Sequence, residues 1–183
     1  MEQQTIYSKP VLEFYTVANE YCLYMEEIDK YPQESIFNYL QRILPLLYLK
    51  GSLLPEIGSV NEEANERFVT EEQRETIAEH IKLKMGNNDK FIDLVVSLSE
   101  NEIQNINLSD ELSLIYNDLK DFLILFQKNT LDAKGNAIKS CKKYFENNWG
   151  ERLIITHKYI HNHIYVIKSK HEEDSLPFND FLQ

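Results

Sequence analysis

Glycine and proline are scarce, with five of each among 183 residues. All-β sandwiches, propellers and collagen-like chains need many more turn residues, so the scarcity argues against these classes. Long apolar runs are missing too. The longest are 122–126 and 43–49, which contains a proline. A membrane-spanning helix requires about 20 apolar residues, so we expect a protein without membrane segments.

Basic residues are few relative to acidic ones. Lysine and arginine number 19 against 30 aspartates and glutamates, a formal net charge of −11. Such a negative charge argues against a protein that binds nucleic acids or anionic membranes in general. One stretch differs, because residues 128–170 carry 9 basic and 3 acidic side chains. Those basic helices can pack beside the acidic ones, or they can meet nucleic acid or an acidic partner, and the first interpretation is the simpler.

Cysteine is limited to Cys22 and Cys141, both within strongly helical patterns and near aromatic residues. The N-terminus lacks the basic start and apolar stretch of a secretory signal. We therefore expect a cytoplasmic protein whose two thiols are buried and reduced.

Apolar side chains recur every three or four residues along most of the chain, which is the signature of amphipathic helices. The pattern predicts helices over 11–28, 33–50, 70–85, 109–126, 133–145 and 151–170. The apolar run 91–98 is short, and the helical neighbours favour helix over strand there. Residues 56–69 are polar and predict a loop or a loosely held short helix. The expected fold is all-α: an antiparallel bundle of about five long helices plus two or three short ones.

Local signals refine this fold. A capping box at Thr70 to Gln73 opens one helix, Ser109 is a plausible cap for another, and Trp149-Gly150 predicts a corner between the last two. Pro45 lies inside helix 33–50 and predicts a kink above about 20° that opens a groove near Tyr48. Alternatively, the helix stops near residue 43 and restarts at Pro45.

Domain organisation is expected to be simple. Residues 1–170 form a single helical domain, and 171–183 form an acidic, mobile tail whose Leu176, Phe178 and Phe181 are able to dock. Several apolar side chains of the first two helices lie off the main stripes. They are Tyr15, Tyr24, Tyr39, Leu46 and Leu49. Wide apolar faces are found on central helices and on helices that pair with another chain, so a homodimer is an expectation to test.

The chain also resembles a known family. The residues that carry the resemblance are 109–120 (SDELSLIYNDLK), then Trp149-Gly150, then His161 one helical stretch later. They are similar to the bacterial domain of unknown function numbered 5063. Where that family tends to have His-Trp-Gly-Arg-His, this chain has Asn148, Trp149, Gly150, Glu151 and Arg152. The resemblance implies an all-helical bacterial protein and a place to look for a site, but no reaction.

Candidate site residues come from these positions. The candidate binding surface consists of Asp110, Glu111, Tyr116, Asp118, Trp149, Arg152 and His161. Carboxylates so placed can do acid–base work when burial separates their pKa values, and they can equally form a solvated helix face. His157 and His161 lie one helical turn apart, which is the spacing of a two-histidine metal site. A tryptophan beside a glycine can contact a ligand or simply fill a structural corner.

No catalytic motif accompanies these residues. The sequence has no glycine-rich phosphate loop, no Gly-x-Ser-x-Gly and no dinucleotide fingerprint. The leading hypothesis is a non-enzymatic helical module, without a cofactor, that binds a protein or a small ligand. The alternative is a metal-dependent hydrolase that uses His157, His161 and nearby carboxylates.

Overall fold

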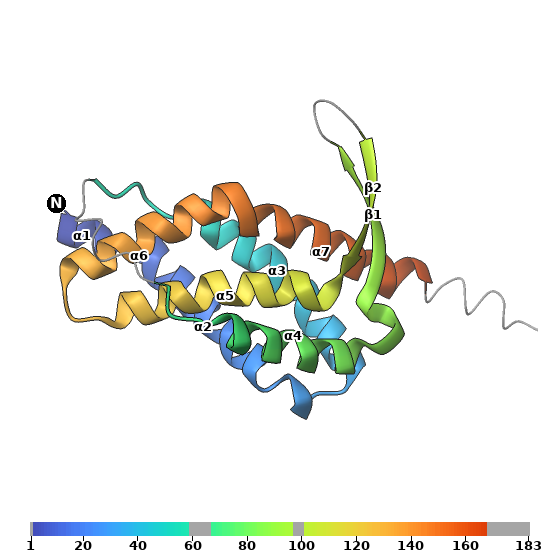
Figure 1. The fold of residues 1–183 in the computed structure, drawn as a ribbon. Coiled ribbons are helices and arrows are strands. Elements are labelled where there is room, and N and C mark those ends of the chain that lie inside the picture. The colour runs from blue at the N-terminus through green and yellow to red at the C-terminus, as the bar shows by residue number, and fades with distance from the viewer. Residues whose placement is uncertain (1, 59–66, 97–100, 168–183) are drawn as a thin grey trace, which may run out of the picture.

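The helical periodicity of the sequence becomes an elongated helical bundle in the computed structural model, which describes residues 2–58, 67–96 and 101–167 (Figure 1). The helices are α1 (Glu2–Ile6), α2 (Lys9–Glu26), α3 (Gln33–Ser52), α4 (Glu71–Met85), α5 (Leu108–Gln127), α6 (Leu131–Tyr144) and α7 (Gly150–Asn162). The predicted all-α bundle is confirmed. The expected tail, 171–183, and most of the expected loop 56–69 lie outside the described residues.

Helix α5 is the centre of the bundle, and it packs against α2, α4, α6 and α7. Helix α3 closes the opposite side by packing on α2 and α7. At the centre, the Phe14 ring lies 5.1 Å from the Phe122 ring and 5.8 Å from the Trp149 ring, centroid to centroid. Fully burying such a side chain contributes about 1.5–3 kcal/mol, so these aromatic residues dominate the packing energy of the core.

Helix α4 begins and ends as its sequence predicts. The Thr70 side chain accepts from the Gln73 amide, and the Gln73 side chain accepts from the Thr70 amide, which completes the capping box. Gly86 ends the helix with φ +53°, a conformation that side chains with a Cβ rarely adopt. Two free thiols, Cys22 and Cys141, are buried as expected, and burial raises the pKa of both.

The predicted short helix at 91–98 is wrong, because this segment enters a β-hairpin. Strand β1 (Lys90–Val96) pairs antiparallel with β2 (Asn101–Asn107), with Phe91 opposite Ile106. Figure 1 shows the hairpin standing away from the bundle at one end. An apolar run this short has no periodicity that separates helix from strand. Its partner strand is mainly polar, so it gave no strand signal of its own.

The predicted corner at Trp149-Gly150 is also wrong. Helix α6 continues through a π turn, Phe145–Trp149, directly into α7, and the two form one long run along the bundle (Figure 1). The Gly150 amide donates to the Phe145 carbonyl five residues earlier, as in a π-helix. A Cβ on Gly150 would collide with that same carbonyl oxygen. Glycine is therefore needed here by the wide turn, and it does not end the helix.

The N-terminus of α5 and the interior of α3 also differ from the sequence-based expectation. Helix α5 begins at Leu108 with Asn107 as its N-cap, while Ser109 is buried and its amide and hydroxyl both donate to Asp89. Helix α3 is continuous through Pro45, so the alternative of two separate helices is wrong. Pro45 is exposed, not part of the buried stripe. The bend angle near it stays a prediction.

Candidate functional site

Trp149 lies in the core and contributes to no surface. Its side chain is 0% exposed, and its indole N–H donates to the Cys141 carbonyl at 3.2 Å. The Phe14 ring stacks on one side, and the Phe145 ring meets it edge-on at 4.8 Å. The tryptophan that sequence reasoning placed in a binding surface instead joins α2 to the π turn.

Glu111 and Arg152 form an ion pair between α5 and α7. One guanidinium nitrogen of Arg152 lies 2.8 Å from each carboxylate oxygen of Glu111. Both side chains are mostly shielded from solvent. Because each group satisfies the other, the pair fastens two helices and leaves neither charge unpaired for a ligand.

Tyr116 makes a second link between helices. Its hydroxyl donates to a Glu26 carboxylate oxygen on α2 at 2.8 Å, and the Lys120 ammonium donates to the same oxygen at 2.6 Å. Burial raises the pKa of Tyr116, and the hydrogen bond to Glu26 raises it further. Tyr116 is thus a neutral hydrogen-bond donor at physiological pH.

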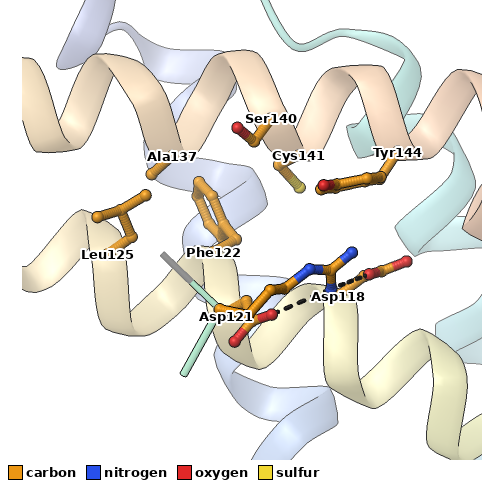
Figure 2. Close-up of a pocket in the computed structure, with 9 residues that line it drawn as sticks. Asp118, Asp121, Phe122, Leu125, Ala137, Ser140, Cys141 and Tyr144 are labelled. Carbon is orange, nitrogen blue, oxygen red and sulfur yellow. Dashed lines mark hydrogen bonds and ion pairs between the residues drawn. The ribbon is translucent and has the colours of Figure 1, made fainter. Parts of the chain in front are cut away.

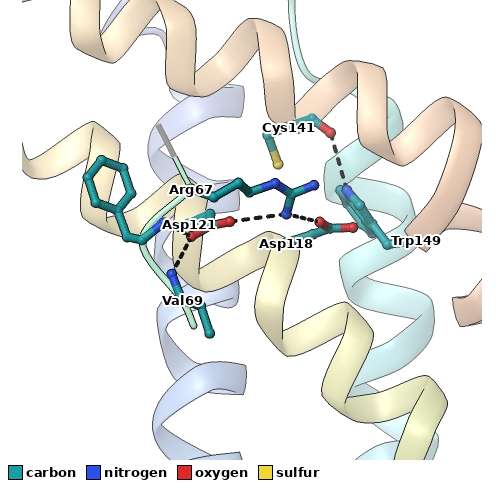
Figure 3. Close-up of polar contacts among 7 residues, drawn as sticks. Arg67, Val69, Asp118, Asp121, Cys141 and Trp149 are labelled. Atoms are coloured by element: carbon teal, nitrogen blue, oxygen red, sulfur yellow. Dashed lines mark hydrogen bonds and ion pairs between the residues drawn. The ribbon is translucent and has the colours of Figure 1, made fainter. Parts of the chain in front are cut away.

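Asp118 belongs to a polar cluster between α5 and α6. Figure 2 shows Asp118 and Asp121 on α5 facing Cys141 and Tyr144 on α6. The Arg67 guanidinium enters between them, 2.7 Å from Asp118 and 3.0 Å from Asp121 (Figure 3). It also lies 4.4 Å from the centre of the Tyr144 ring, a cation–π contact.

Burial raises the pKa of Asp118, and the hydrogen bond from Arg67 opposes that rise. Asp121 is 8% exposed and accepts from the amides of Phe68 and Val69, at 2.8 and 2.9 Å (Figure 3). The space left in the pocket is about 50 Å³. A water molecule occupies about 30 Å³ of liquid, so little beyond water fits while Arg67 is in place. The cluster holds segment 67–69 on the bundle.

The remaining predicted residues lie apart from these. Asp110 is exposed and accepts from the Asn107 amide group at 2.7 Å. His161 is exposed beside the Tyr165 ring, and His157 lies in a different groove with Lys158. Among residues 2–58, 67–96 and 101–167, no group of three His, Cys, Asp or Glu side chains is arranged to hold a metal ion. The structure therefore does not gather the predicted binding residues on one surface.

A groove that sequence reasoning missed lies between α2 and α3. We call it the tyrosine groove, and it measures about 620 Å³. Its lining residues are Glu20, Tyr24, Tyr31, Ser35, Asn38, Tyr39, Arg42, Ile43 and Leu46. The Tyr24 ring is sandwiched between its neighbours, with centroids 4.3 Å from Tyr31 and 3.6 Å from Tyr39. Three stacked phenol rings therefore form one continuous aromatic wall.

The polar groups of this groove are unused by the described part of the chain. The Tyr39 hydroxyl is buried without a hydrogen-bond partner, and burial raises the pKa of Tyr39. Buried hydroxyls in proteins are normally satisfied, so an orphan one calls for an explanation. Tyr24 and Tyr39 were the residues from which this groove could have been predicted. Both lie outside the main apolar stripe of their helix and widen its apolar face. In the sequence analysis that width indicated either central helices or helices that pair with another chain.

Comparison with known proteins places the chain. The family model described as domain of unknown function DUF5063 matches residues 5–166. The chain belongs to this family. Among solved structures, it is similar to the crystal structure of protein BF1032 from Bacteroides fragilis, with 31% sequence identity and a TM-score of 0.78. The match covers 89% of this chain and 97% of that one. None of the curated proteins matches the chain.

In this DUF5063 member, Asn148 and Arg152 flank Trp149, Gly150 and Glu151. Asn148 is exposed on the π turn, and Arg152 is committed to Glu111. No helix in the part of the chain described here is long and apolar enough to cross a membrane. Neither the family's description nor the name of the similar protein states an activity, so function has to be argued from the grooves.

Proposed function

We propose that this DUF5063 protein is a non-catalytic binding protein that takes a small aromatic zwitterion, such as an aromatic amino acid, in the tyrosine groove. The observation that carries the proposal is the stacked wall of Tyr24, Tyr31 and Tyr39 beside a buried hydroxyl that has no partner. Small-molecule sites are typically concave, about 300–1,000 Å³, and lined by apolar and aromatic residues with a few polar groups. The groove, at about 620 Å³, fits that description.

The aromatic wall supports a ligand with a flat ring. Tyrosine rings favour offset-stacked or edge-on partners, and such contacts add about 0.5–1.5 kcal/mol beyond the area they bury. Ile43 and Leu46 supply further apolar surface along α3. The Tyr39 hydroxyl is a buried donor without an acceptor, so a ligand oxygen that reaches it when the Tyr39 side chain turns toward the groove removes an unmet hydrogen bond.

The charges of the groove support a ligand that carries both signs. Glu20 comes from α2 and Arg42 from α3, so opposite charges stand on the two walls. Neither makes an ion pair or hydrogen bond with another described residue. A carboxylate suits the Arg42 guanidinium, which binds such groups bidentately, and an ammonium suits Glu20. An amino acid supplies both, together with the ring.

Calorimetric titration tests this function with L-phenylalanine, 3-phenylpropionate and 2-phenylethylamine. We expect saturable binding of L-phenylalanine and weaker binding of the two compounds that lack one charge. Tyr39→Phe removes only the orphan hydroxyl, and Arg42→Gln removes only the cation. Each should weaken L-phenylalanine binding by about tenfold, which is about 1.4 kcal/mol.

Matched controls are Tyr7→Phe and Lys143→Gln, which change exposed residues outside the groove. Both should bind L-phenylalanine like the unaltered protein. Absence of saturable binding, or equal losses in the control and groove variants, would reject the proposal. The hydrolase alternative gains no support from the described residues, because His157 and His161 do not converge with carboxylates.

A further inference from the structure

The tyrosine groove has a charged end and a neutral polar end. Helices α2 and α3 pack on each other, and the chain reverses direction in the short turn between them, which contains Tyr31 (Figure 1). The groove residues nearest this turn are Tyr24 on α2 and Ser35 on α3. Glu20 lies about one helical turn farther along α2, and Arg42 lies about two helical turns farther along α3. Both charges are therefore at the end of the groove away from the turn.

Ser35 and Asn38 supply neutral polar groups nearer the turn. Both are exposed residues that line the groove, and neither forms a hydrogen bond with another described residue. Together with Arg42 they occupy positions i, i+3 and i+7, which share one face of α3. A hydroxyl and a carboxamide, each able to donate and to accept, thus border the same space as the stacked tyrosine rings.

The helix sets the spacing between these groups and the guanidinium. A rise of about 1.5 Å per residue places Asn38 about 6 Å and Ser35 about 10.5 Å from Arg42 along the axis of α3. In an extended aromatic amino acid the para position of the ring is farthest from the carboxylate. The length from the carboxylate to a para oxygen falls between these two spacings. A ligand whose carboxylate pairs with Arg42 therefore brings its para substituent between Asn38 and Ser35.

We propose that the ligand of the tyrosine groove is a para-hydroxylated aromatic amino acid of the L-tyrosine class, and that Ser35 and Asn38 select it. This inference rests on the proposed function and narrows its ligand from any aromatic amino acid to a phenol. The phenol hydroxyl donates to the side-chain oxygen of Asn38 and accepts from the hydroxyl of Ser35. A ring without the hydroxyl leaves both side chains to water.

The exposure of these two residues limits the size of the preference. A buried site built to hydrogen-bond a substrate hydroxyl can reject the analogue that lacks it by a factor of about 10⁴–10⁵. Exposed groups instead exchange their hydrogen bonds with water, which leaves only a small net gain. We therefore expect L-tyrosine to bind about three- to tenfold more tightly than L-phenylalanine.

Calorimetric titration of the full chain with L-tyrosine, L-phenylalanine and 4-fluoro-L-phenylalanine tests this selection. Fluorine is close to a hydroxyl in size but donates no hydrogen bond, so the fluoro compound should bind like L-phenylalanine. The double variant Ser35→Ala/Asn38→Leu should lower the affinity for L-tyrosine to that for L-phenylalanine. Its affinity for L-phenylalanine should be unchanged, which also shows that the groove is intact. The matched control is Asn148→Leu at an exposed position outside the groove, and it should keep the full preference.

The outcomes separate this inference from the proposed function. Equal affinities for L-tyrosine and L-phenylalanine overturn the selection alone. A preference for L-tyrosine that persists in the double variant also overturns it, as does a fluoro compound that binds as tightly as L-tyrosine, because the size of the substituent would then be the cause. If none of the three compounds binds, the proposed function fails and this inference fails with it.

Discussion

Replacing Gly51 with alanine should destabilise this protein, although glycine within a helix is normally a liability. Gly51 is buried in the last turn of α3. A Cβ there would lie 2.5 Å from the tip of the Trp149 indole and 2.9 Å from the Phe145 ring. Contacts this short require one of the partners to move.

Two opposing effects set the magnitude. Alanine is favoured over glycine in a helix by about 1 kcal/mol. Overpacking a well-filled core costs about 1–3 kcal/mol. The upper part of that range applies, because the Trp149 ring is held by Phe14, Phe145 and a hydrogen bond to the Cys141 carbonyl. We expect a net loss of about 1–2 kcal/mol, or a fall in Tm of about 2–8 °C.

A double-mutant cycle measured by urea unfolding isolates the steric cause. Trp149→Phe removes the indole atoms that the new Cβ would strike, at the cost of a cavity. In that background Gly51→Ala should cost clearly less, since the contact with the indole is gone and only the approach to the Phe145 ring still opposes the helix propensity of alanine. The control is Ser52→Ala at the exposed neighbouring position, which adds alanine to the same turn without a steric contact and removes only the hydrogen bond from the Ser52 hydroxyl to the Leu49 carbonyl. If Gly51→Ala costs the same with and without the indole, the close approach of α3 to Trp149 is not what requires glycine.

Three other changes test the remaining contacts. Asp121→Ala removes the acceptor of two backbone amides and one partner of Arg67. It should lower the free energy of unfolding in urea by about 2–3 kcal/mol. A loss below half of that would contradict the role of the cluster in holding segment 67–69. Burial raises the pKa of Tyr24 from 10.0 to about 12. The folded state therefore favours the neutral phenol, and stability should fall as the pH rises from 10.0 to about 12. Tyr24→Phe should reduce that fall and remove one tyrosinate absorbance step near pH 12, while the steps of Tyr39 and Tyr116 remain at higher pH. An unchanged titration refutes the prediction. Pro45→Ala restores a donor for the Gln41 carbonyl in a continuous helix. It should stabilise the protein by about 1–2 kcal/mol, which is less than the roughly 3 kcal/mol that an interior proline costs. A lower Tm would show that the bend itself is needed.

Sequence reasoning succeeded where the signal is local and periodic. The stripes that became α2, α3 and α5, and the capping box of α4, depend on residues within a few positions of one another. It failed at the hairpin, because β1 is defined by its pairing with β2 and not by its own pattern. It also failed at the π turn, where glycine and tryptophan resemble a helix end although the backbone continues.

The candidate site was less predictable for the same reason. Asp118 was singled out, but its partner Arg67 lies 51 residues away in a segment without periodicity. The tyrosine groove combines Tyr24 of α2, Tyr31 of the following turn and Tyr39 of α3. Nothing in the spacing of these residues shows that their rings stack. Stacking depends on the angle at which α2 and α3 cross, and that angle is set by the whole core.

The π turn determines which faces of the continuous α6–α7 run contact the neighbouring helices. A regular helix rotates by about 100° for each residue, so the one additional residue of a π turn shifts the phase of everything that follows it. Upstream of the turn α6 packs mainly on α5, and downstream α7 packs mainly on α3 while it keeps a smaller contact with α5. A chain shortened by one residue within Phe145–Trp149 would keep its helix but rotate Leu153 and Ile160 away from the core. In this fold the length of that turn is therefore as strictly determined as the identity of any buried side chain.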